Sequence, residues 1–234
     1  MIQFYSPDIK SSLILGPEEA HHCVKVLRRK AGDIIYVTDG LGKRFECRII
    51  LADTKRLQLE IINEEYIPKG WNYELVIAVA PTKNAERMSW LVEKATEIGV
   101  DSIRFVVCRN SERKNLNIER LRRNAISAMN QSLKTRLPDL KEPVPLKSVL
   151  NFKGEKLFGY CDSETERKEF IKEYRGGDIV ILIGPEGDFD HEEVRMLTDG
   201  GFSAVTFGDE RLRTETAALY GLAAVHIINQ IEKK

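Results

Sequence analysis

Two glycine-containing clusters near the end of the chain carry the residues best suited to hold a ligand. The first cluster contains Gly184-Pro185-Glu186-Gly187, and the second joins Phe207-Gly208 to Leu212-Arg213-Thr214-Glu215-Thr216. Glycine lets a ligand approach the backbone closely, so that amide and carbonyl groups can recognise it. In an open α/β sheet, the carboxyl ends of the parallel strands form the ligand-binding edge. Because each cluster follows an apolar run, both turns are expected to face one site.

The first cluster has the pattern of a strand-to-helix turn. The apolar run Asp178 to Ile183 is typical of a parallel strand that is covered on both faces. After the turn, Asp190 has the position of a helix N-cap and Glu193 that of its capping-box partner. Phe189 can then pack against Val194 as a hydrophobic staple. Gly184 to Asp188 are therefore expected to form the loop.

The second cluster repeats this order. A strand from Ser203 to Phe207 ends in Gly208, and an alanine-rich helix is expected over Glu215 to Gln230. Thr214 is a plausible N-cap for that helix, because a threonine hydroxyl can accept a hydrogen bond from a free backbone N–H.

Strand-like and helix-like segments alternate upstream of both clusters. This order predicts a parallel sheet with helices on both faces. The expected strands are 74–80, 103–107 and 156–160, and the expected helices are 85–98, 118–133 and 165–174.

A break in the pattern at Tyr66 to Trp71 indicates a domain boundary, because Pro68 and Gly70 interrupt it. Short alternating segments precede the break and predict a small β-barrel with one helix. The strands are expected over 34–38, 44–51 and 56–62, and the helix over 17–29. The chain is therefore expected to hold a barrel domain at 1–70 and an α/β domain at 71–234.

Composition excludes several classes of protein. The 36 basic and 36 acidic side chains give no net charge, which argues against a uniformly positive surface for bulk nucleic-acid binding. No apolar stretch approaches the roughly 20 residues of a membrane span, and the N-terminus lacks the order of a signal peptide. We therefore expect a cytoplasmic protein without a membrane partner.

The four cysteines, Cys23, Cys47, Cys108 and Cys161, are widely separated in the sequence. They form neither a C-x-x-C pair nor a metal-ligand spacing with the histidines. We expect free thiols and no metal.

Positive charge is concentrated in two regions. One is the cluster at 25–30, and the other is the segment 104–136, which holds nine basic residues against two acidic ones. Such patches suit nucleic-acid phosphates, although the sequence leaves open that they are ordinary solvated charges. The candidate nucleic-acid-binding residues are Lys25, Arg28, Arg29, Arg113, Arg122, Arg123 and Arg136, together with Lys83 and Arg87 outside the two regions.

The glycine turns match none of the common nucleotide or acyl-transfer motifs. Ala80-Pro81-Thr82 stands where a dinucleotide-binding G-x-G-x-x-G would follow the first strand of the sheet. The chain contains no G-x-x-x-x-G-K-[ST] and no G-x-S-x-G. Dinucleotides, P-loop phosphates and serine-dependent acyl transfer are therefore disfavoured.

Seven motifs, in order along the chain, together resemble the RsmE family. They are Lys83, Arg87-Met88, Glu93-Lys94, Glu97-Ile98-Gly99-Val100, Ser111-Glu112-Arg113, Gly184-Pro185-Glu186-Gly187 and Leu212-Arg213-Thr214-Glu215-Thr216. The N-terminal His21-His22, Val26-Leu27-Arg28 and Gly32-Asp33 are also similar to this family. RsmE proteins are methyltransferases of the SPOUT superfamily that use S-adenosylmethionine to methylate N3 of one uridine in 16S ribosomal RNA. The resemblance extends over essentially the whole chain.

The resemblance implies a SPOUT-type parallel sheet with a C-terminal trefoil knot, which is a rare exception to the rule that chains do not thread loops. It implies a PUA-like, RNA-binding barrel before that sheet. It also implies a homodimer whose partner is small-subunit rRNA or the 30S particle. Three loops would hold the cofactor, through Tyr160, Leu182, Gly184, Pro185, Glu186, Gly187, Phe207, Gly208, Leu212, Arg213 and Thr214.

The chain departs from the family's pattern at two places. Asp188 stands where a second glycine often follows the first turn, and we expect the cofactor geometry to survive this change. Asn130-Gln131 and Leu133 to Arg136 replace the Glu-Gln and Gly-Arg pairs of many relatives, which puts the role of that segment in RNA binding in doubt.

The chemistry follows from the implied substrate. Uridine N3 carries a proton that must leave before the nitrogen attacks the sulfonium methyl group, so a cation near O2 or O4 would stabilise the uridinate. We expect Arg213 to supply this charge and Glu215 to orient Arg213 or relay the proton. Simple capping of the last helix by Thr214 and Glu215 is the alternative for those residues. For the whole protein, the alternative is a non-catalytic RNA-binding ribosome assembly factor with the same fold.

Overall fold

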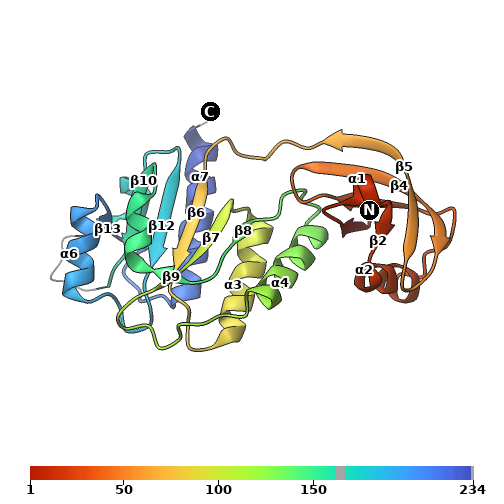
Figure 1. The fold of residues 1–234 in the computed structure, drawn as a ribbon. Helices are drawn as coiled ribbons and strands as arrows, with labels where there is room; N and C mark the ends of the chain where they lie inside the picture. Colours follow the sequence, from red (N-terminus) through yellow and green to blue (C-terminus); the bar gives the residue numbers. More distant parts are fainter. Residues whose placement is uncertain (162–166, 233–234) are drawn as a thin grey trace. The chain divides into compact units, whose positions relative to one another are not determined.

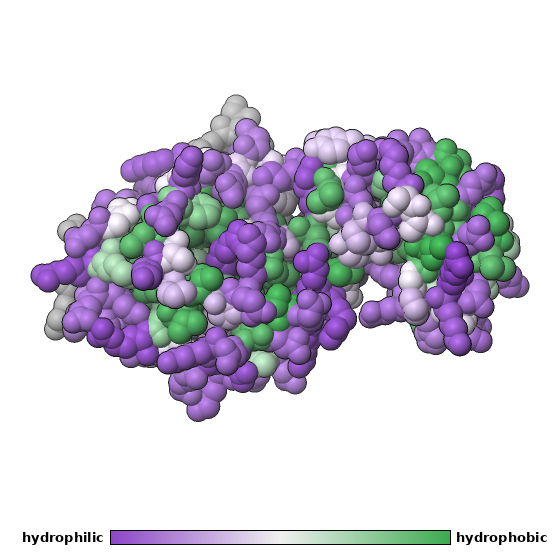
Figure 2. All heavy atoms as spheres, in the orientation of Figure 1, coloured by the Kyte–Doolittle hydropathy of each residue, from purple (hydrophilic) through white to green (hydrophobic). Residues whose placement is uncertain are grey.

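The computed structural model describes residues 1–161 and 167–232. Two compact units make up the chain. The first comprises Met1–Gly70 together with Ile126–Leu137, and the second comprises Trp71–Ala125 together with Pro138–Lys234. Hydrophilic residues cover most of the face drawn in Figure 2, with hydrophobic residues in patches between them. Within the described residues, no helix is both long enough and apolar enough to cross a membrane.

The first unit is built on one sheet of short and long strands. Its order is β1 (Gln3–Tyr5), β3 (Ile34–Thr38), β4 (Lys43–Ala52), β5 (Leu57–Tyr66) and β2 (Ile14–Leu15). β1 and β3 are parallel, and the other neighbours are antiparallel. Alternate residues of β4 and β5, such as Phe45, Cys47 and Leu59, are buried in the core of this unit, as a strand period of two requires. The three expected strands are confirmed, while closure into a barrel stays a prediction.

The expected helix over 17–29 is confirmed as helical through Val26 and is wrong only in its last three residues. Helix α2 (Pro17–His21) passes into a π-helical turn over His22–Val26, and the turn ends at Leu27. Arg28 then has φ +53°, a left-handed conformation that no helix interior allows. Neither Arg28 nor Arg29 is a helix breaker, so the sequence pattern extended the helix too far. A short helix, α1 (Ile9–Ser12), precedes β2.

Residues 126–137 pack with the first unit, although the sequence pattern grouped them with the second domain. The amide of Gly42 donates to the carbonyl of Thr135 at 2.9 Å, and the amide of Leu137 donates to the carbonyl of Gly40 at 3.0 Å. Thr38 Oγ1 also donates to the Thr135 carbonyl. These bonds satisfy the backbone of a turn in the sheet, which local sequence could not reveal.

A parallel sheet forms the second unit (Figure 1). Its order is β11 (Lys168–Glu169), β13 (Ser203–Thr206), β10 (Glu155–Gly159), β12 (Ile179–Ile183), β6 (Leu75–Val79), β7 (Ser102–Val107) and β8 (Asp139–Leu140), with β9 (Val144–Pro145) paired to β7. All of these pairs are parallel. Every residue of β6 and β12 is buried, which explains their unbroken apolar sequences.

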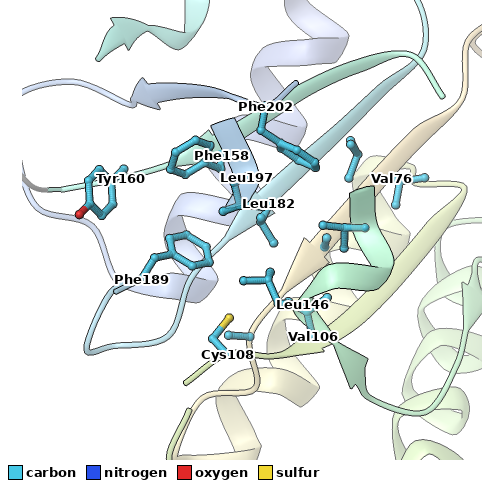
Figure 3. Packing of buried hydrophobic residues seen from close by; sticks show 14 residues of the cluster. Val76, Val106, Cys108, Leu146, Phe158, Tyr160, Leu182, Phe189, Leu197 and Phe202 are labelled. Atoms are coloured by element: carbon cyan, nitrogen blue, oxygen red, sulfur yellow. The ribbon is translucent and has the colours of Figure 1, made fainter. Parts of the chain in front are cut away.

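Helices cover both faces of this sheet. Helix α7 (Thr214–Glu232) packs on β12, β6 and α3 (Ala85–Ile98). On the other face, α6 (His191–Asp199) and a 3₁₀ segment over Leu146–Asn151 enclose a core cluster that includes Phe158, Leu182 and Phe189 (Figure 3). The parallel α/β sheet expected from the sequence is confirmed.

Several predicted boundaries shift. Helix α4 (Ile118–Gln131) ends two residues before its expected end, and strands β7, β10 and β13 agree with prediction to within a residue at most ends. The expected helix over 165–174 is largely wrong, because the chain forms β11 and then the four-residue helix α5 (Phe170–Glu173). The first two residues of that expected helix lie outside the described residues. The capping box of α6 is confirmed, with Asp190 Oδ1 accepting from Glu193 N at 2.8 Å.

Candidate active site

A cavity of about 660 Å³ opens in the second unit at the carboxyl ends of β10, β12 and β13. This is the edge at which open α/β sheets bind ligands. The structure brings both glycine clusters to this one cavity, as the sequence predicts. The predicted cofactor residues that line it are Tyr160, Gly184, Pro185, Glu186, Phe207, Gly208, Leu212, Arg213 and Thr214.

Two predicted cofactor residues do not line the described part of the cavity wall. Leu182 is fully buried in the core cluster beside Phe158 and Phe189, on the opposite side of the strand from its neighbour Ile183, which does line the cavity. The alternation of side chains along β12 explains this difference. Gly187 instead lies against Asn110, whose Cβ would be 3.3 Å from a Cβ at position 187.

The turn after β12, residues 184–189, is tightly packed. A Cβ on Gly184 would lie 2.9 Å from Cε2 of Phe189, and Phe189 is itself 4% exposed and in edge contact with Phe158. The Glu186 carboxylate accepts from the backbone N–H of Lys83 at 3.1 Å. A side chain at position 184 therefore has no space unless the aromatic core moves.

Asp188, which stands where the family pattern often has a glycine, adopts a backbone conformation that favours glycine. Its φ of +60° is the left-handed conformation that glycine adopts most easily and that aspartate tolerates better than most residues. The carboxylate accepts from the backbone N–H of Cys161 at 3.1 Å. Asn110 Nδ2 donates to the carbonyls of Gly187 and Asp188. The aspartate thus links the end of β10 to the turn after β12.

The loop after β13, residues 207–213, is much more open. Gly208 has φ +113° with no atom within 4 Å of a Cβ placed there, and the residues from Gly208 to Arg211 are exposed. Phe207 anchors the start of the loop by packing against Phe170 and Tyr220. Beyond Phe207, the loop presents backbone and charged side chains to the cavity.

The predicted N-cap role of Thr214 is wrong. Helix α7 begins at Thr214 itself, and the Thr214 hydroxyl donates to the carbonyl of Gly184 at 3.1 Å in a buried position. The hydroxyl therefore ties the start of the last helix to the first glycine turn. Sequence pattern could not distinguish these roles, because both use a threonine at a helix start.

The two predicted catalytic residues differ in their surroundings. Arg213 is exposed and lines the cavity. Glu215 is 5% exposed, and its Oε1 lies 3.6 Å from Nε of Arg87, a cavity-lining residue that the sequence analysis assigned to RNA binding. Orientation of Arg213 by Glu215 stays a prediction.

The cavity wall carries charges of both signs. Among the described residues that line it are the arginines Arg87, Arg167, Arg211 and Arg213 and the carboxylates Glu186, Asp188, Asp209 and Glu210. Arg167, which the sequence analysis missed, donates through Nη1 to the carbonyls of Tyr160 and Cys161. No sequence motif marks Arg167, whose contact is with backbone carbonyls just after the end of β10.

Several basic residues of the segment 104–136 have hydrogen-bond or ion-pair partners within their own unit. Arg113 donates to the carbonyls of Thr82 and Lys83, and the Lys83 ammonium pairs with Glu112 at 3.0 Å. Arg104 and Arg109 have carboxylate partners. Arg122 and Arg123 are exposed on α4, as are Lys114 and Arg120 nearby, and the described residues offer none of these four an ion-pair partner.

The basic residues of the first unit show a similar division. Lys25 and Arg28 are exposed, whereas Arg29 Nη1 lies 3.9 Å from Asp33 Oδ2. Arg136 stacks over the Tyr66 ring at 5.5 Å and donates to the Tyr66 hydroxyl. Arg136 therefore has a packing role in addition to any role in binding.

The four cysteines are free, as expected, and Cys161 alone among them is exposed and lines the cavity. Burial raises the pKa of the Cys108 thiol to about 12 and that of Cys23 to about 11. The pKa of Cys161 is also raised, first by burial and then by the charge of Asp188. In the described part of the chain, no group of three or more His, Cys, Asp or Glu side chains is arranged to hold a metal ion.

The chain is similar to several known proteins over nearly its whole length. A probable rRNA-methyltransferase from Porphyromonas gingivalis is 39% identical, with a TM-score of 0.94 over 99% of this chain and 100% of that chain. Ribosomal RNA small subunit methyltransferase E from Neisseria gonorrhoeae, solved bound to S-adenosyl methionine, is 26% identical, with a TM-score of 0.85 over 97% and 98%. Ribosomal RNA small subunit methyltransferase E from Mycobacterium bovis is 28% identical over 95% of this chain and 88% of the relative.

Two family models also match the chain, over separate ranges of the sequence. The model of an RNA methyltransferase PUA domain matches residues 15–62. The model of an RNA methyltransferase domain matches residues 69–226, a range that contains every cavity-lining residue. The resemblance to RsmE proteins drawn from the motifs is confirmed, and the chain belongs to the RNA methyltransferase family.

Proposed function

We propose that this protein transfers a methyl group from S-adenosylmethionine to N3 of one uridine in 16S ribosomal RNA. The observation that carries the proposal is the cavity in which the turn at Gly184 and the loop at Gly208 meet. Relatives of this chain are small-subunit rRNA methyltransferases, and one was solved with S-adenosyl methionine bound. The cavity is large enough for a nucleoside cofactor, within the range of about 300–1,000 Å³ usual for small-molecule sites.

The residues present fit S-adenosylmethionine. Gly208 offers bare backbone to an adenosine, and Phe207, Leu212 and Ile183 supply apolar contact. The cofactor has a positively charged sulfonium and amino group and a negatively charged carboxylate. The arginines and carboxylates of the wall can pair with these charges. When bound, the cofactor supplies the electrophilic methyl group.

Arg213 is the proposed cation for the target base. It is exposed at the cavity wall immediately before α7, so its guanidinium can approach O2 or O4 of a uridine. Loss of the N3 proton places negative charge on those oxygens, and a fixed positive charge stabilises it. The N3 edge takes part in every Watson–Crick pair, so the uridine must be unpaired or flipped out.

RNA would be held through its phosphates by the basic residues that remain exposed. Among the residues predicted to bind RNA, the exposed ones are Lys25 and Arg28 in the first unit and Lys83, Arg122 and Arg123 in the second. Arg113 and Arg136 make internal hydrogen bonds, so we assign them to holding the RNA-binding surface in shape. Binding through phosphates predicts an affinity that falls steeply as salt rises.

Four further features belong to the same proposal. The first is a C-terminal trefoil knot, supported by a strand order in which β10 lies between β12 and β13. The second is a PUA-like barrel at 1–70 before a methyltransferase domain at 71–234. The third is a homodimer acting on rRNA or the 30S particle, and the fourth is a cytoplasmic location. Sedimentation of the pure protein tests the dimer directly.

The proposal is tested by transfer of labelled methyl from S-adenosylmethionine to small ribosomal subunits that lack the modification, with free small-subunit rRNA alongside. Nuclease digestion should yield label in N3-methyluridine. Cofactor binding without transfer to either substrate would redirect the search to another RNA. Failure to bind the cofactor would favour the non-catalytic assembly factor, which the intact glycine turns argue against.

A further inference from the structure

Arg87 and Glu215 form an ion pair at the wall of the cavity. Arg87 lies in the first turn of α3 and Glu215 in the first turn of α7, two helices that pack against each other. The Arg87 side chain is 32% exposed and lines the cavity, whereas the Glu215 side chain is 6% exposed and lies behind it. The pair therefore connects the buried helix interface to the site.

The hydrogen bonding of this pair is incomplete. Nε of Arg87 is 3.6 Å from Oε1 of Glu215, which is too long for a hydrogen bond. Oε2 of Glu215 is buried and accepts no hydrogen bond from any described residue. A buried carboxylate oxygen without a donor is costly, so such groups in native proteins usually have a purpose.

The geometry of a guanidinium suggests how the pair can be completed. Arginine has five N–H donors in a planar fork, and a side-on pair with a carboxylate uses Nε–H and one N–H of a terminal nitrogen. A small approach of Arg87 to Glu215 would satisfy both carboxylate oxygens in this way. The remaining N–H groups would then stay available to a ligand in the cavity.

Arg87 differs in this respect from the other arginines at the site. Arg167 is held by the carbonyls of Tyr160 and Cys161, and Arg213 is exposed at the end of an open loop. Arg87 extends from a regular helix and has a buried counter-charge behind it. Groups on regular elements are placed more precisely than groups on loops, and a fixed dipole or charge stabilises developing charge without reorganisation.

We propose that Arg87 is a second catalytic residue, which donates hydrogen bonds to O2 or O4 of the target uridine, and that Glu215 is its positioning residue. This inference rests on the proposed function. In the step, the N3 proton leaves to water, and the N3 electron pair forms a bond to the methyl carbon. The carbon–sulfur bond breaks at the same time, and its electron pair neutralises the sulfonium. Arg87 shares with Arg213 the negative charge that develops on the pyrimidine oxygens.

The test compares Arg87→Ala, Arg87→Lys and Glu215→Gln with the unmodified protein and with Arg195→Ala, an exposed arginine on α6 as the matched control. Removing one preorganised donor of this kind lowers kcat by about 10²–10³, so the kcat of Arg87→Ala should fall by roughly that factor. The dissociation constant for S-adenosylmethionine should change much less. Arg87→Lys should recover part of the loss, because it keeps the charge without the planar fork. Arg195→Ala should behave like the unmodified protein.

Two further readouts separate a catalytic role from a structural one. Subunits reconstituted with 5-fluorouridine carry a more acidic N3. This substrate should therefore raise the kcat of Arg87→Ala by a larger factor than it raises the kcat of the unmodified protein. As a single variant, Glu215→Gln should lower kcat. In an Arg87→Ala background it should lower kcat little further, because the effects of residues that act through one another are not additive.

The outcomes are distinguishable. Near-normal kcat in Arg87→Ala, with normal transfer by the unmodified protein, would overturn the role of Arg87 and leave the proposed function intact. If Glu215→Gln lowers kcat by the same factor in the unmodified protein and in Arg87→Ala, the positioning role of Glu215 would be overturned. No transfer by the unmodified protein, despite cofactor binding, would overturn the proposed function and this inference with it.

Discussion

The two backbone segments that meet at the cavity are built in opposite ways. The turn at 184–189 is fixed by packing of Gly184 against Phe189 and by hydrogen bonds from Cys161 and Asn110. The loop at 207–213 is anchored at Phe207 and is exposed from Gly208 to Arg211. A rigid wall defines where a ligand lies, and an open wall can adjust to it. The site thus combines preorganisation with access, on two strands separated in the sheet by β10.

The largest expected effect comes from adding one methyl group to each segment in turn. Gly184→Ala places a Cβ 2.9 Å from the Phe189 ring, and overpacking of this kind costs about 1–3 kcal/mol. Gly208→Ala meets no atom within 4 Å, so it introduces backbone strain only, in a loop that can shift. Thermal unfolding should show a clear fall in melting temperature for Gly184→Ala and a smaller fall for Gly208→Ala. Equal losses would show that the two segments are equally constrained.

The next effect concerns the link between the two segments. Thr214→Val removes the hydroxyl that donates to Gly184 and leaves the shape nearly unchanged. Loss of a buried hydrogen bond of this kind costs about 1 kcal/mol. Chemical denaturation should detect this fall in the free energy of unfolding. Thr214→Ser keeps the hydroxyl, so its free energy of unfolding should fall clearly less. If valine and serine behave alike, the hydrogen bond does not hold the two segments together.

A smaller effect should separate the two roles of Asp188, which are its backbone conformation and its hydrogen bond to Cys161. Asp188→Ala loses the bond and keeps a side chain at φ +60°, whereas Asp188→Gly loses the bond but relieves the strain. Alanine in the left-handed conformation is less stable than glycine by about 1 kcal/mol. The alanine variant should therefore unfold at a lower denaturant concentration than the glycine variant. The reverse order would mean that strain at this position is negligible.

The smallest effect is a difference in chemical accessibility at the same edge. Cys161 is exposed in the cavity, while the other three cysteines are buried. Alkylation of the native protein should modify Cys161 first. Because the thiolate reacts and the pKa of Cys161 is raised above its usual 9.0, the rate should keep increasing as pH rises past 9.

S-adenosylmethionine provides the control for this labelling. A cofactor in the cavity should slow the modification of Cys161, and a Cys161→Ser variant should lose the fast phase altogether. Rapid labelling of Cys108, whose pKa is about 12, would contradict the packing described for the core.

Much of the fold could be predicted because its signals are local. The apolar runs of β6 and β12, the amphipathic helix α3 and the capping box at Asp190 each depend on residues close in sequence. The errors occurred where the backbone departs from its local pattern. The helix from Pro17 was extended past a π-helical turn, and residues 168–173 form a short strand and helix instead of one longer helix.

The candidate site divides in the same way. Glycine turns at strand ends indicate a ligand-binding edge, so most of the cofactor residues predicted from the sequence do line the cavity. It could not separate Leu182 from Ile183, because the side of the sheet toward which each faces depends on which helix covers that side. The contact of Arg87 with Glu215 and that of Arg167 with Tyr160 were likewise hidden, because no sequence motif specifies them.

The sequence by itself determined the alternation of strands and helices, the two glycine clusters and the family resemblance, because all of these are recorded in residue types and their order. Tertiary structure alone decided that Thr214 bonds to Gly184, that Asp188 reaches Cys161 and that Glu215 lies behind Arg87. Each of these contacts joins residues that lie on, or directly follow, different strands or helices. Their distances are set by the packing of the sheet between its helices, which no local pattern specifies.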